Sequence, residues 1–281
     1  IISPLVIKRQ LIRFDIPVMV GLSLLLVLVS LDGRISVFDG MLLLAVLVFH
    51  IIMSILIGRR TAVESNDQPN ELPVISKPTS MWLAALLLAV GVGLLVLGAQ
   101  LLVSGAVNIA TGLGVSSLVI GLTVVALGTS LPELATSIIA LRRGERDMAV
   151  GNIVGSNLFN IGVVLGLPAI IFGQGIPVPP AAIALDLPLM LAAAVALLPI
   201  AFTGFIIARW EGVMFVALYA AYALYLVLAS TEHDAAQGFT IVMLWFVLPL
   251  LAVTIIAVTS YEVGLVRGRN GRIRPKDAPD S

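Results

Sequence analysis

The chain has 281 residues, of which 59% are hydrophobic and only 11% charged, and its mean hydropathy is +1.12. Soluble domains are nearer half apolar and a quarter charged, so this composition excludes an ordinary soluble domain and predicts a polytopic membrane protein. The formal net charge of zero gives no indication of a nucleic-acid partner, and the absence of cysteine excludes disulfides and thiolate metal sites.

Eight apolar runs are long enough to cross the hydrocarbon layer of a bilayer, which is about 30 Å thick and takes about 17–25 helical residues. In chain order they cover residues 14–31, 40–57, 81–103, 117–141, 149–172, 183–202, 211–229 and 239–261. The expected fold class is therefore all-α, a polytopic bundle of transmembrane helices that is in contact with membrane lipid.

The basic residues fall almost entirely on one side of these spans. Fifteen of the 16 Lys and Arg residues lie before the first span, in alternate loops or in the tail after residue 265, and only Arg34 lies opposite. Cytoplasmic loops carry the excess of Lys and Arg, so the pattern predicts a multi-pass protein of the cytoplasmic membrane with both termini in the cytoplasm.

Two segments of the chain repeat one another. Residues 13–20 match residues 184–191, with Asp15 and Asp186 among the identical positions, and residues 38–40 match residues 210–212 after one inserted residue. The two copies are separated by an odd number of spans, so they face opposite ways across the bilayer, as in the inverted repeats of secondary transporters.

The repeat predicts how the chain is divided. The first copy, residues 1–60, holds two spans, and its front is expected to be missing. Residues 61–80 form a cytoplasmic linker rich in proline, residues 81–229 form the five-span second copy, residues 230–264 hold an extra helix, and residues 265–281 form a basic cytoplasmic tail. Because the first copy lacks its front and so leaves only half of a site, we expect either a natural polypeptide that is longer at its N-terminus or a pairing of two chains as a homodimer.

The run at 117–141 contains an acidic residue at membrane depth, Glu133. An ionisable group there is costly, so it is by default a functional-site candidate. Pro132 has no N–H and clashes with the carbonyl of Gly128, which predicts a helix break at Ala126 to Ser130. Thr129 and Ser130 lie four and three residues before Glu133, on the same side of the helix. Oxygen ligands of this kind suit hard cations such as Na⁺ and Ca²⁺.

The next span carries amides and a hydroxyl at helical spacing. Asn152, Ser156 and Asn160 share one face, and Asn157 lies one step around. They can supply uncharged oxygens to a cation. The alternative is helix packing, because Gly151-xxx-Gly155 and Gly162-xxx-Gly166 are small-xxx-small patterns, and this alternative stays open for Asn152, Asn157 and the glycines.

The remaining titratable groups are interpreted as structural. Asp15, Asp39, Asp186 and Glu211 lie near span ends, where we expect water or head groups to solvate them. His50 lies within an apolar helix and is interpreted as a hydrogen-bonded core histidine, with a proton relay as the alternative.

The stretch Gly-Leu-Thr-Val-Val-Ala-Leu-Gly-Thr-Ser-Leu-Pro-Glu-Leu-Ala-Thr-Ser that ends at Ser137, followed by Gly-Glu-Arg-Asp147 and by Gly-Asn-Ile-Val-Gly-Ser-Asn-Leu-Phe-Asn160, resembles a known motif. It is similar to the alpha-repeat of the cation/calcium exchanger superfamily, in its prokaryotic sodium/calcium exchanger branch. The resemblance covers about residues 3–229 and places the alpha-repeat at 117–172.

The resemblance implies ten helices in two inverted repeats, each contributing a kinked helix pair to a central cluster of cation sites, with alternating access by two helices that slide against the core. It implies that Glu133 is the main carboxylate ligand. Hydroxyl, carbonyl and amide ligands would come from Thr129, Ser130, Ala126, Ser156 and Asn160. Some relatives carry Asp at the position of Asn160, so the amide removes one negative charge from the site.

The function expected from these observations is a secondary antiporter that exchanges Ca²⁺ for Na⁺ across the cytoplasmic membrane. One alternative exchanges Ca²⁺ or another cation for protons, and a second is a non-transporting half-transporter subunit. An enzyme is not expected, because the sequence has no nucleophile with a base, no His/Cys metal set and no phosphate loop. No cofactor is expected beyond the transported Na⁺ and Ca²⁺.

Overall fold

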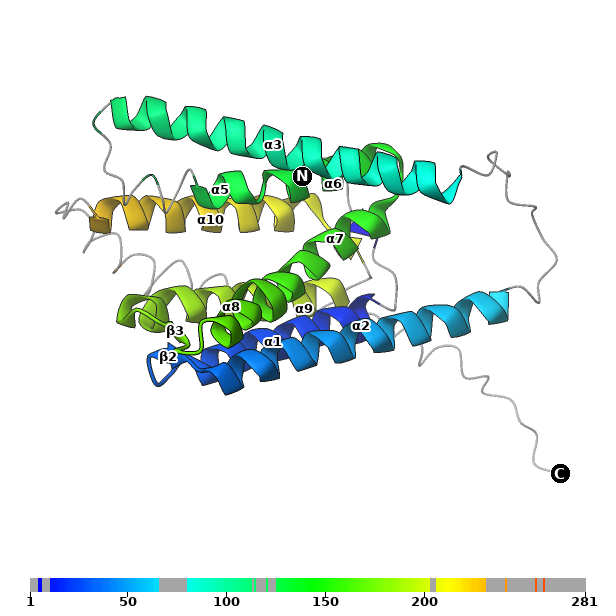
Figure 1. Cartoon of the computed structure of the whole chain (residues 1–281), viewed down its shortest axis with the longest axis horizontal. Coiled ribbons are helices and arrows are strands. Elements are labelled where there is room, and N and C mark those ends of the chain that lie inside the picture. Colours follow the sequence, from blue (N-terminus) through cyan, green and yellow to red (C-terminus); the bar gives the residue numbers. More distant parts are fainter. Residues whose placement is uncertain are drawn as a thin grey trace.

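The computed structural model describes residues 5–6, 11–65, 80–112, 125–202 and 206–230, together with the single positions 114, 120, 241, 256 and 260. The first part holds strand β1 (Leu5–Val6), the π-helical segment η1 (Leu11–Asp15), helix α1 (Ile16–Val29), strand β2 (Arg34–Ile35) and helix α2 (Val37–Ser65). Helix α3 (Met81–Gly112) follows and lies along the opposite edge of the bundle from α1 and α2 (Figure 1).

The second part begins with the short helix α5 (Ala126–Thr129), followed by α6 (Leu131–Arg142) and α7 (Arg146–Phe159). The π-helical segment η3 (Asn160–Leu165) continues α7 into α8 (Gly166–Ile171). Strand β3 (Ile176–Pro177), π-helical segment η4 (Ala182–Asp186), helix α9 (Leu187–Phe202), strand β4 (Ile206–Ile207) and helix α10 (Arg209–Ser230) complete the described chain.

Six helices in the described residues are long and apolar enough to span a membrane: Leu11–Val29, Val37–Gly58, Met81–Ile109, Arg146–Ile171, Ala182–Ile200 and Arg209–Ala229. They confirm six of the eight predicted spans and a polytopic helical membrane protein. The predicted run at 117–141 is interrupted at Ser130, which lies between α5 and α6, and in its described part no single helix is long enough to span. The predicted span at 239–261 lies outside the described residues except for three isolated positions.

The apolar core lies where α1, α2 and α7 meet. Ile12, Ile16, Leu22, Leu43 and Leu158 are fully buried there. Helix α3 has no buried residue in its most apolar stretch, and its main contacts within the described part of the chain are with α5 and α6. The apolar side chains that cover α3 suit a surface that faces lipid.

The inverted repeat is visible in the elements themselves. Strand β3, segment η4 and helix α9 begin 171 residues after β1, η1 and α1, and strand β4 and helix α10 begin 172 residues after β2 and α2. The repeat seen in the sequence therefore extends to two strands and a π-helical segment that the sequence did not predict.

The strand pairing joins the two copies and shows that they are inverted. Strand β1, which precedes α1, pairs antiparallel with β4, which follows α9, through Leu5 opposite Ile207. Strand β2, which follows α1, pairs with β3, which leads to α9, through Ile35 opposite Ile176. The start of α1 thus lies beside the end of α9, and the end of α1 lies beside the start of α9. These two helices, which contact one another, therefore run antiparallel.

Acidic residues begin the second helix of each copy. The carboxylate of Asp39 accepts hydrogen bonds from the N–H and the hydroxyl of Ser36, at 2.8 and 2.6 Å, and Ser36 Oγ accepts one from the N–H of Asp39. The carboxylate of Glu211 accepts the N–H of Ala208 at 2.7 Å. Both carboxylates satisfy N–H groups that the first turn of a helix leaves unpaired.

The expected solvation of the acidic residues near span ends is wrong for two of them. Glu211 is 5% exposed and Asp15 is 8% exposed. Each is buried because a hydrogen-bond partner satisfies its carboxylate: the N–H of Ala208 for Glu211, and the hydroxyl of Ser54 for Asp15. Asp186, which is partly buried, accepts a hydrogen bond from the hydroxyl of Tyr222 at 2.8 Å.

Candidate cation site

The candidate site starts at the break between α5 and α6. Ser130 has φ −94° and ψ 3°, outside the helical range, and α6 resumes at Leu131 with Pro132 in its first turn. The break lies where the sequence predicts it, because proline cannot donate the hydrogen bond that would continue α5. Glu133 is thereby placed in the first turn of α6, where the positive end of the helix dipole favours a carboxylate.

One oxygen of the Glu133 carboxylate is buried. This atom, Oε2, has no hydrogen-bond partner among the residues that the structure describes. A buried, unpartnered carboxylate oxygen is costly in an apolar surrounding, because the charge has lost its water without replacement. A bound cation or a proton would compensate that charge.

Two of the hydroxyls predicted as ligands direct their hydrogens to main-chain carbonyls. Thr129 Oγ1 donates to the carbonyl of Ala126 at 3.1 Å, and Ser156 Oγ donates to the carbonyl of Ile153 at 3.0 Å. Once a hydroxyl hydrogen is engaged in this way, the oxygen lone pairs remain available to a cation. Neither bond crosses between helices, so the two hydroxyls are oriented within their own helices.

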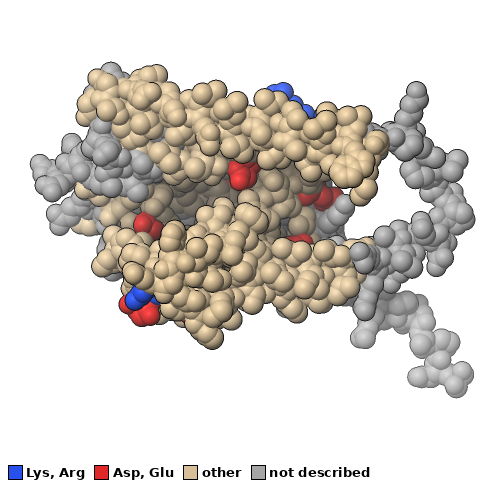
Figure 2. Space-filling model, in the orientation of Figure 1, with Lys and Arg blue, Asp and Glu red and all other residues tan. Residues whose placement is uncertain are grey.

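Several of the sequence-predicted ligands lie on an open face. Ala126, Thr129, Ser130 and Asn160 are exposed, and Asn160 is the first residue of η3. Figure 2 shows a hollow between the ridge formed by α3 and the helices below it, with acidic side chains inside the hollow. Among the described residues no three His, Cys, Asp or Glu side chains come together. Glu133 is the one carboxylate among the ligands that the sequence predicts.

Asn152 has a different role from the predicted ligands on its helix. Its Nδ2 atom lies 3.1 Å from the carbonyl oxygen of Glu133, 2.9 Å from Thr136 Oγ1 and 3.1 Å from Ser137 Oγ. These contacts tie α7 to α6 at the residue that carries the candidate carboxylate. Helix packing thus accounts for Asn152, one of the two alternatives that the sequence leaves open.

Thr136 and Ser137 are residues that the sequence analysis did not select. Thr136 Oγ1 lies 2.9 Å from the carbonyl of Pro132 and 3.0 Å from that of Glu133, and Ser137 is buried. A signal was present, since the two residues follow Glu133 by three and four positions and so share its side of the helix.

The two small-xxx-small patterns differ in the structure. A Cβ atom on Gly162 would lie 2.6 Å from Leu47 Cβ, and one on Gly166 would lie 3.0 Å from the carbonyl oxygen of Gly40. This pair lets η3 and α8 approach α2 closely. At Gly155 a Cβ would meet no described atom within 4 Å, so only the second pattern marks a tight helix contact.

Asn157 packs against α1, with Nδ2 3.7 Å from Met19 Sδ.

Comparison with known proteins gives consistent matches to one family. The family described as sodium/calcium exchanger protein matches residues 83–228. Inner membrane protein YrbG of Escherichia coli (strain K12) is 34% identical over 173 residues, which cover 61% of this chain and 53% of that protein. Sodium/calcium exchanger MaX1 of Methanosarcina acetivorans is 37% identical over 85 residues, which cover 30% of this chain and 24% of MaX1.

The fold is similar to that of a solved transporter. A structure of the sodium-calcium exchanger NCX_Mj soaked with Na⁺ and Ca²⁺ matches with a TM-score of 0.59 and 31% sequence identity, covering 78% of this chain and 67% of that one. The chain spans about half the length of the Escherichia coli protein and about a quarter of MaX1.

Proposed function

Because the chain belongs to the sodium/calcium exchanger family, we propose that it works in a secondary antiporter that exchanges Ca²⁺ for Na⁺ across the cytoplasmic membrane by alternating access. The observation that carries this proposal is the buried Oε2 of Glu133, which has no hydrogen-bond partner in the described part of the chain and lies at the start of α6, just after the helix break at Ser130. The sodium/calcium exchangers MaX1 and NCX_Mj, to which the chain is similar, support the choice of ions.

In this proposal Glu133 is the charged ligand. Thr129, Ser130, the carbonyl of Ala126, Ser156 and Asn160 supply uncharged oxygens. A calcium ion takes about 6–8 oxygen ligands, so one carboxylate and these groups make a partial shell. The exposure of Ala126, Thr129, Ser130 and Asn160 supports completion of the shell by further ligands, from a second copy or from polypeptide outside these 281 residues. The transport involves no enzymatic step and no cofactor.

The direct test measures ⁴⁵Ca²⁺ uptake into vesicles that contain the full chain, driven by an imposed Na⁺ gradient. We expect Glu133→Gln to lower uptake about tenfold or more, because a hydrogen bond or contact to a charged group contributes about 1.5–3 kcal/mol. Glu145→Gln is the matched control, since Glu145 is an exposed residue in the turn between α6 and α7. Equal uptake by the Glu133 variant and the control would remove Glu133 from the mechanism.

A second candidate exchanges Ca²⁺ for protons, because an unpartnered buried carboxylate can carry a proton as readily as it binds a metal ion. Replacing Na⁺ with choline while imposing a pH gradient separates the two. Uptake that survives in choline supports proton coupling, and uptake that is lost supports Na⁺ coupling. If the full chain transports under neither gradient, a non-transporting subunit replaces both candidates.

A further inference from the structure

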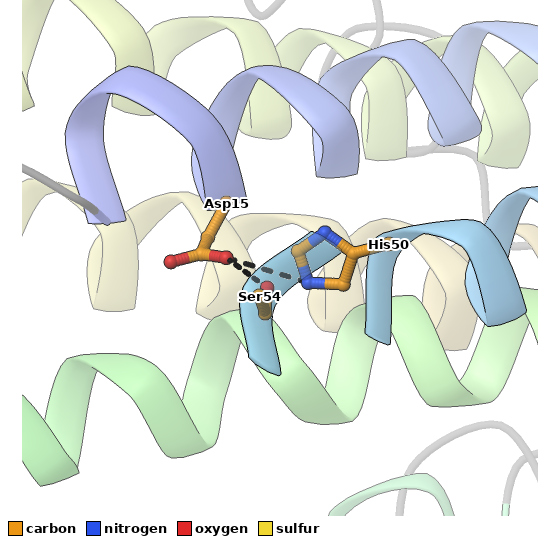
Figure 3. Close-up of polar contacts among 3 residues, drawn as sticks. All are labelled: Asp15, His50 and Ser54. Atoms are coloured by element: carbon orange, nitrogen blue, oxygen red, sulfur yellow. Dashed lines mark hydrogen bonds and ion pairs between the residues drawn. The ribbon is translucent and has the colours of Figure 1, made fainter. Parts of the chain in front are cut away.

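A second polar cluster lies away from Glu133, between η1 and α2. His50 Nε2 lies 3.4 Å from Asp15 Oδ1, and Ser54 Oγ donates to the same oxygen at 3.3 Å (Figure 3). The ring of Phe14 stacks on the imidazole, with centroids 5.2 Å apart. An acidic and a basic side chain, each about nine-tenths buried, therefore face one another inside the apolar core.

The imidazole keeps one nitrogen unused. His50 Nδ1 is buried and has no hydrogen-bond partner among the described residues. In a neutral imidazole one nitrogen carries a proton and the other accepts, whereas both nitrogens carry protons in the charged form. The geometry thus leaves one ring position at which the proton content of the cluster can change while the contact to Asp15 is kept.

The repeat provides an internal comparison. At the offsets of 171 and 172 residues, Asp15 corresponds to Asp186, and His50 corresponds to Tyr222. The structure makes the equivalent contact in the second copy, where the hydroxyl of Tyr222 donates to Asp186 at 2.8 Å. The inverted repeat therefore conserves a contact between its two helices but builds it with different chemistry in each copy.

The chemistry differs in one respect that matters near neutral pH. An imidazole changes charge between about pH 5 and pH 8, whereas a phenol in water titrates near pH 10. The positions of Ser54 and Phe14 are also apolar in the second copy, as Leu226 and Leu185. Only the first copy combines the carboxylate with an aliphatic hydroxyl and a ring of the kind that changes charge near neutral pH.

We propose that Asp15 and His50 form a proton-binding site, separate from the Glu133 cluster, whose occupancy sets how firmly the start of α1 is held to α2. With the imidazole protonated, the pair is an ion pair in a poorly hydrated core. With the imidazole neutral, a charged Asp15 keeps only Ser54 and a neutral N–H as partners. The proton bound here is not the exchanged ion, so the site adds pH control to the proposed exchange.

Among the described residues, few other charged side chains lie on the elements packed against this cluster. Helix α1, segment η3 and helix α8, which pack against α2, carry no titratable side chain, and neither does α9, which touches η1. Segment η1 adds the exposed Arg13, and α7, which also touches η1, carries Arg146 and Asp147 in its first turn. The remaining charged residues on α2 are Asp39, Arg59, Arg60 and Glu64.

The direct test is NMR of ¹⁵N-histidine in the full chain in lipid nanodiscs. The chain has two histidines, so His233→Gln leaves His50 as the sole signal. We expect His50 to titrate between about pH 5 and pH 8. Asp15→Asn should move the midpoint by about one pH unit or more, because a charge within contact distance shifts a titration by about 1–3 units. Asp39→Asn, which changes a helix-capping carboxylate on α2, is the control and should leave the midpoint in place.

This measurement does not depend on transport, so its outcome is separate from that of the proposed function. A His50 signal that does not change between pH 5 and pH 8, or a midpoint that Asp15→Asn leaves unchanged, would overturn the site. If His50→Tyr, the variant of the uptake test that follows, fails to fold, the Asp15→Asn titration still decides.

The effect on exchange is measured as ⁴⁵Ca²⁺ uptake against pH. We expect the uptake rate of the unmodified chain to change between about pH 5 and pH 8, and we expect His50→Tyr, which installs the partner of the second copy, to lose that change. Tyr222→Phe removes a hydroxyl that does not titrate in this range, so it should keep that change. An unaltered pH profile in His50→Tyr would contradict a role for the pair in controlling exchange.

Discussion

The side-chain amide of Asn152 donates to the main-chain carbonyl of Glu133 across 3.1 Å. The same nitrogen also lies within hydrogen-bond distance of Thr136 and Ser137, so one amide on α7 holds the first two turns of α6. Helix α7 therefore holds the backbone of Glu133, and through that backbone it positions the side chain that is proposed to bind the cation.

Replacing Asn152 with Ala should weaken the contact between α6 and α7. We expect a loss of about 1 kcal/mol, because hydrogen bonds between membrane helices average about 0.6 kcal/mol and here three acceptors lose one donor. The measurement is the thermal midpoint of the full chain in detergent, followed by size-exclusion chromatography. Asn157→Ala, which gives up a single weak contact to Met19, should lower the midpoint less.

Replacing Gly40 with Ala should force α2 and α8 apart. The new Cβ would lie 2.7 Å from the carbonyl oxygen of Gly166 and 2.9 Å from Ala169 Cβ, closer than unbonded atoms approach. Overpacking of this kind costs about 1–3 kcal/mol. The same thermal assay checks it against Gly155→Ala, where the added methyl group meets no described atom. Equal midpoints for both variants would contradict the close approach.

Replacing Pro132 with Ala should allow α5 and α6 to join. The new N–H can donate to the carbonyl of Gly128, so the cause of the helix break at Ser130 is removed. We expect Ca²⁺ uptake to fall while the thermal midpoint stays the same or rises. A variant that transports normally would show that the break is not needed for exchange.

The membrane orientation can be checked with single cysteines, because the natural chain has none. The excess of basic residues predicts that Arg143→Cys faces the cytoplasm and that Arg34→Cys faces the opposite side. A membrane-impermeant maleimide added to intact cells should label Arg34→Cys and spare Arg143→Cys. The reverse pattern would invert the proposed orientation.

The sequence predicts the helix break well because its cause is local. Pro132 acts on the carbonyl four residues before it, so no distant contact is needed to find the break. The spans that qualify by length and composition are predicted for the same reason, since the bilayer acts on each helix alone.

The burial of Asp15 depends instead on residues far along the chain. Its partners His50 and Ser54 lie on the next helix, and 39 residues separate Ser54 from Asp15. The position of Asp15 near the end of a span therefore suggests that water solvates it. In the structure, packing against the next helix excludes that water. The glycine patterns show the same limit: Gly151-xxx-Gly155 and Gly162-xxx-Gly166 read alike, yet only the second meets a neighbouring helix closely.

The paired strands have a consequence for motion during transport. Since β1 is bonded to β4 and β2 to β3, the antiparallel helices α1 and α9 are fastened to each other at both ends. The two helices cannot separate at either end without breaking main-chain hydrogen bonds, so we expect them to move as one rigid unit. Among the described residues α3 makes its main contacts with α5 and α6 alone, so in the proposed exchange we expect the larger displacement in α3.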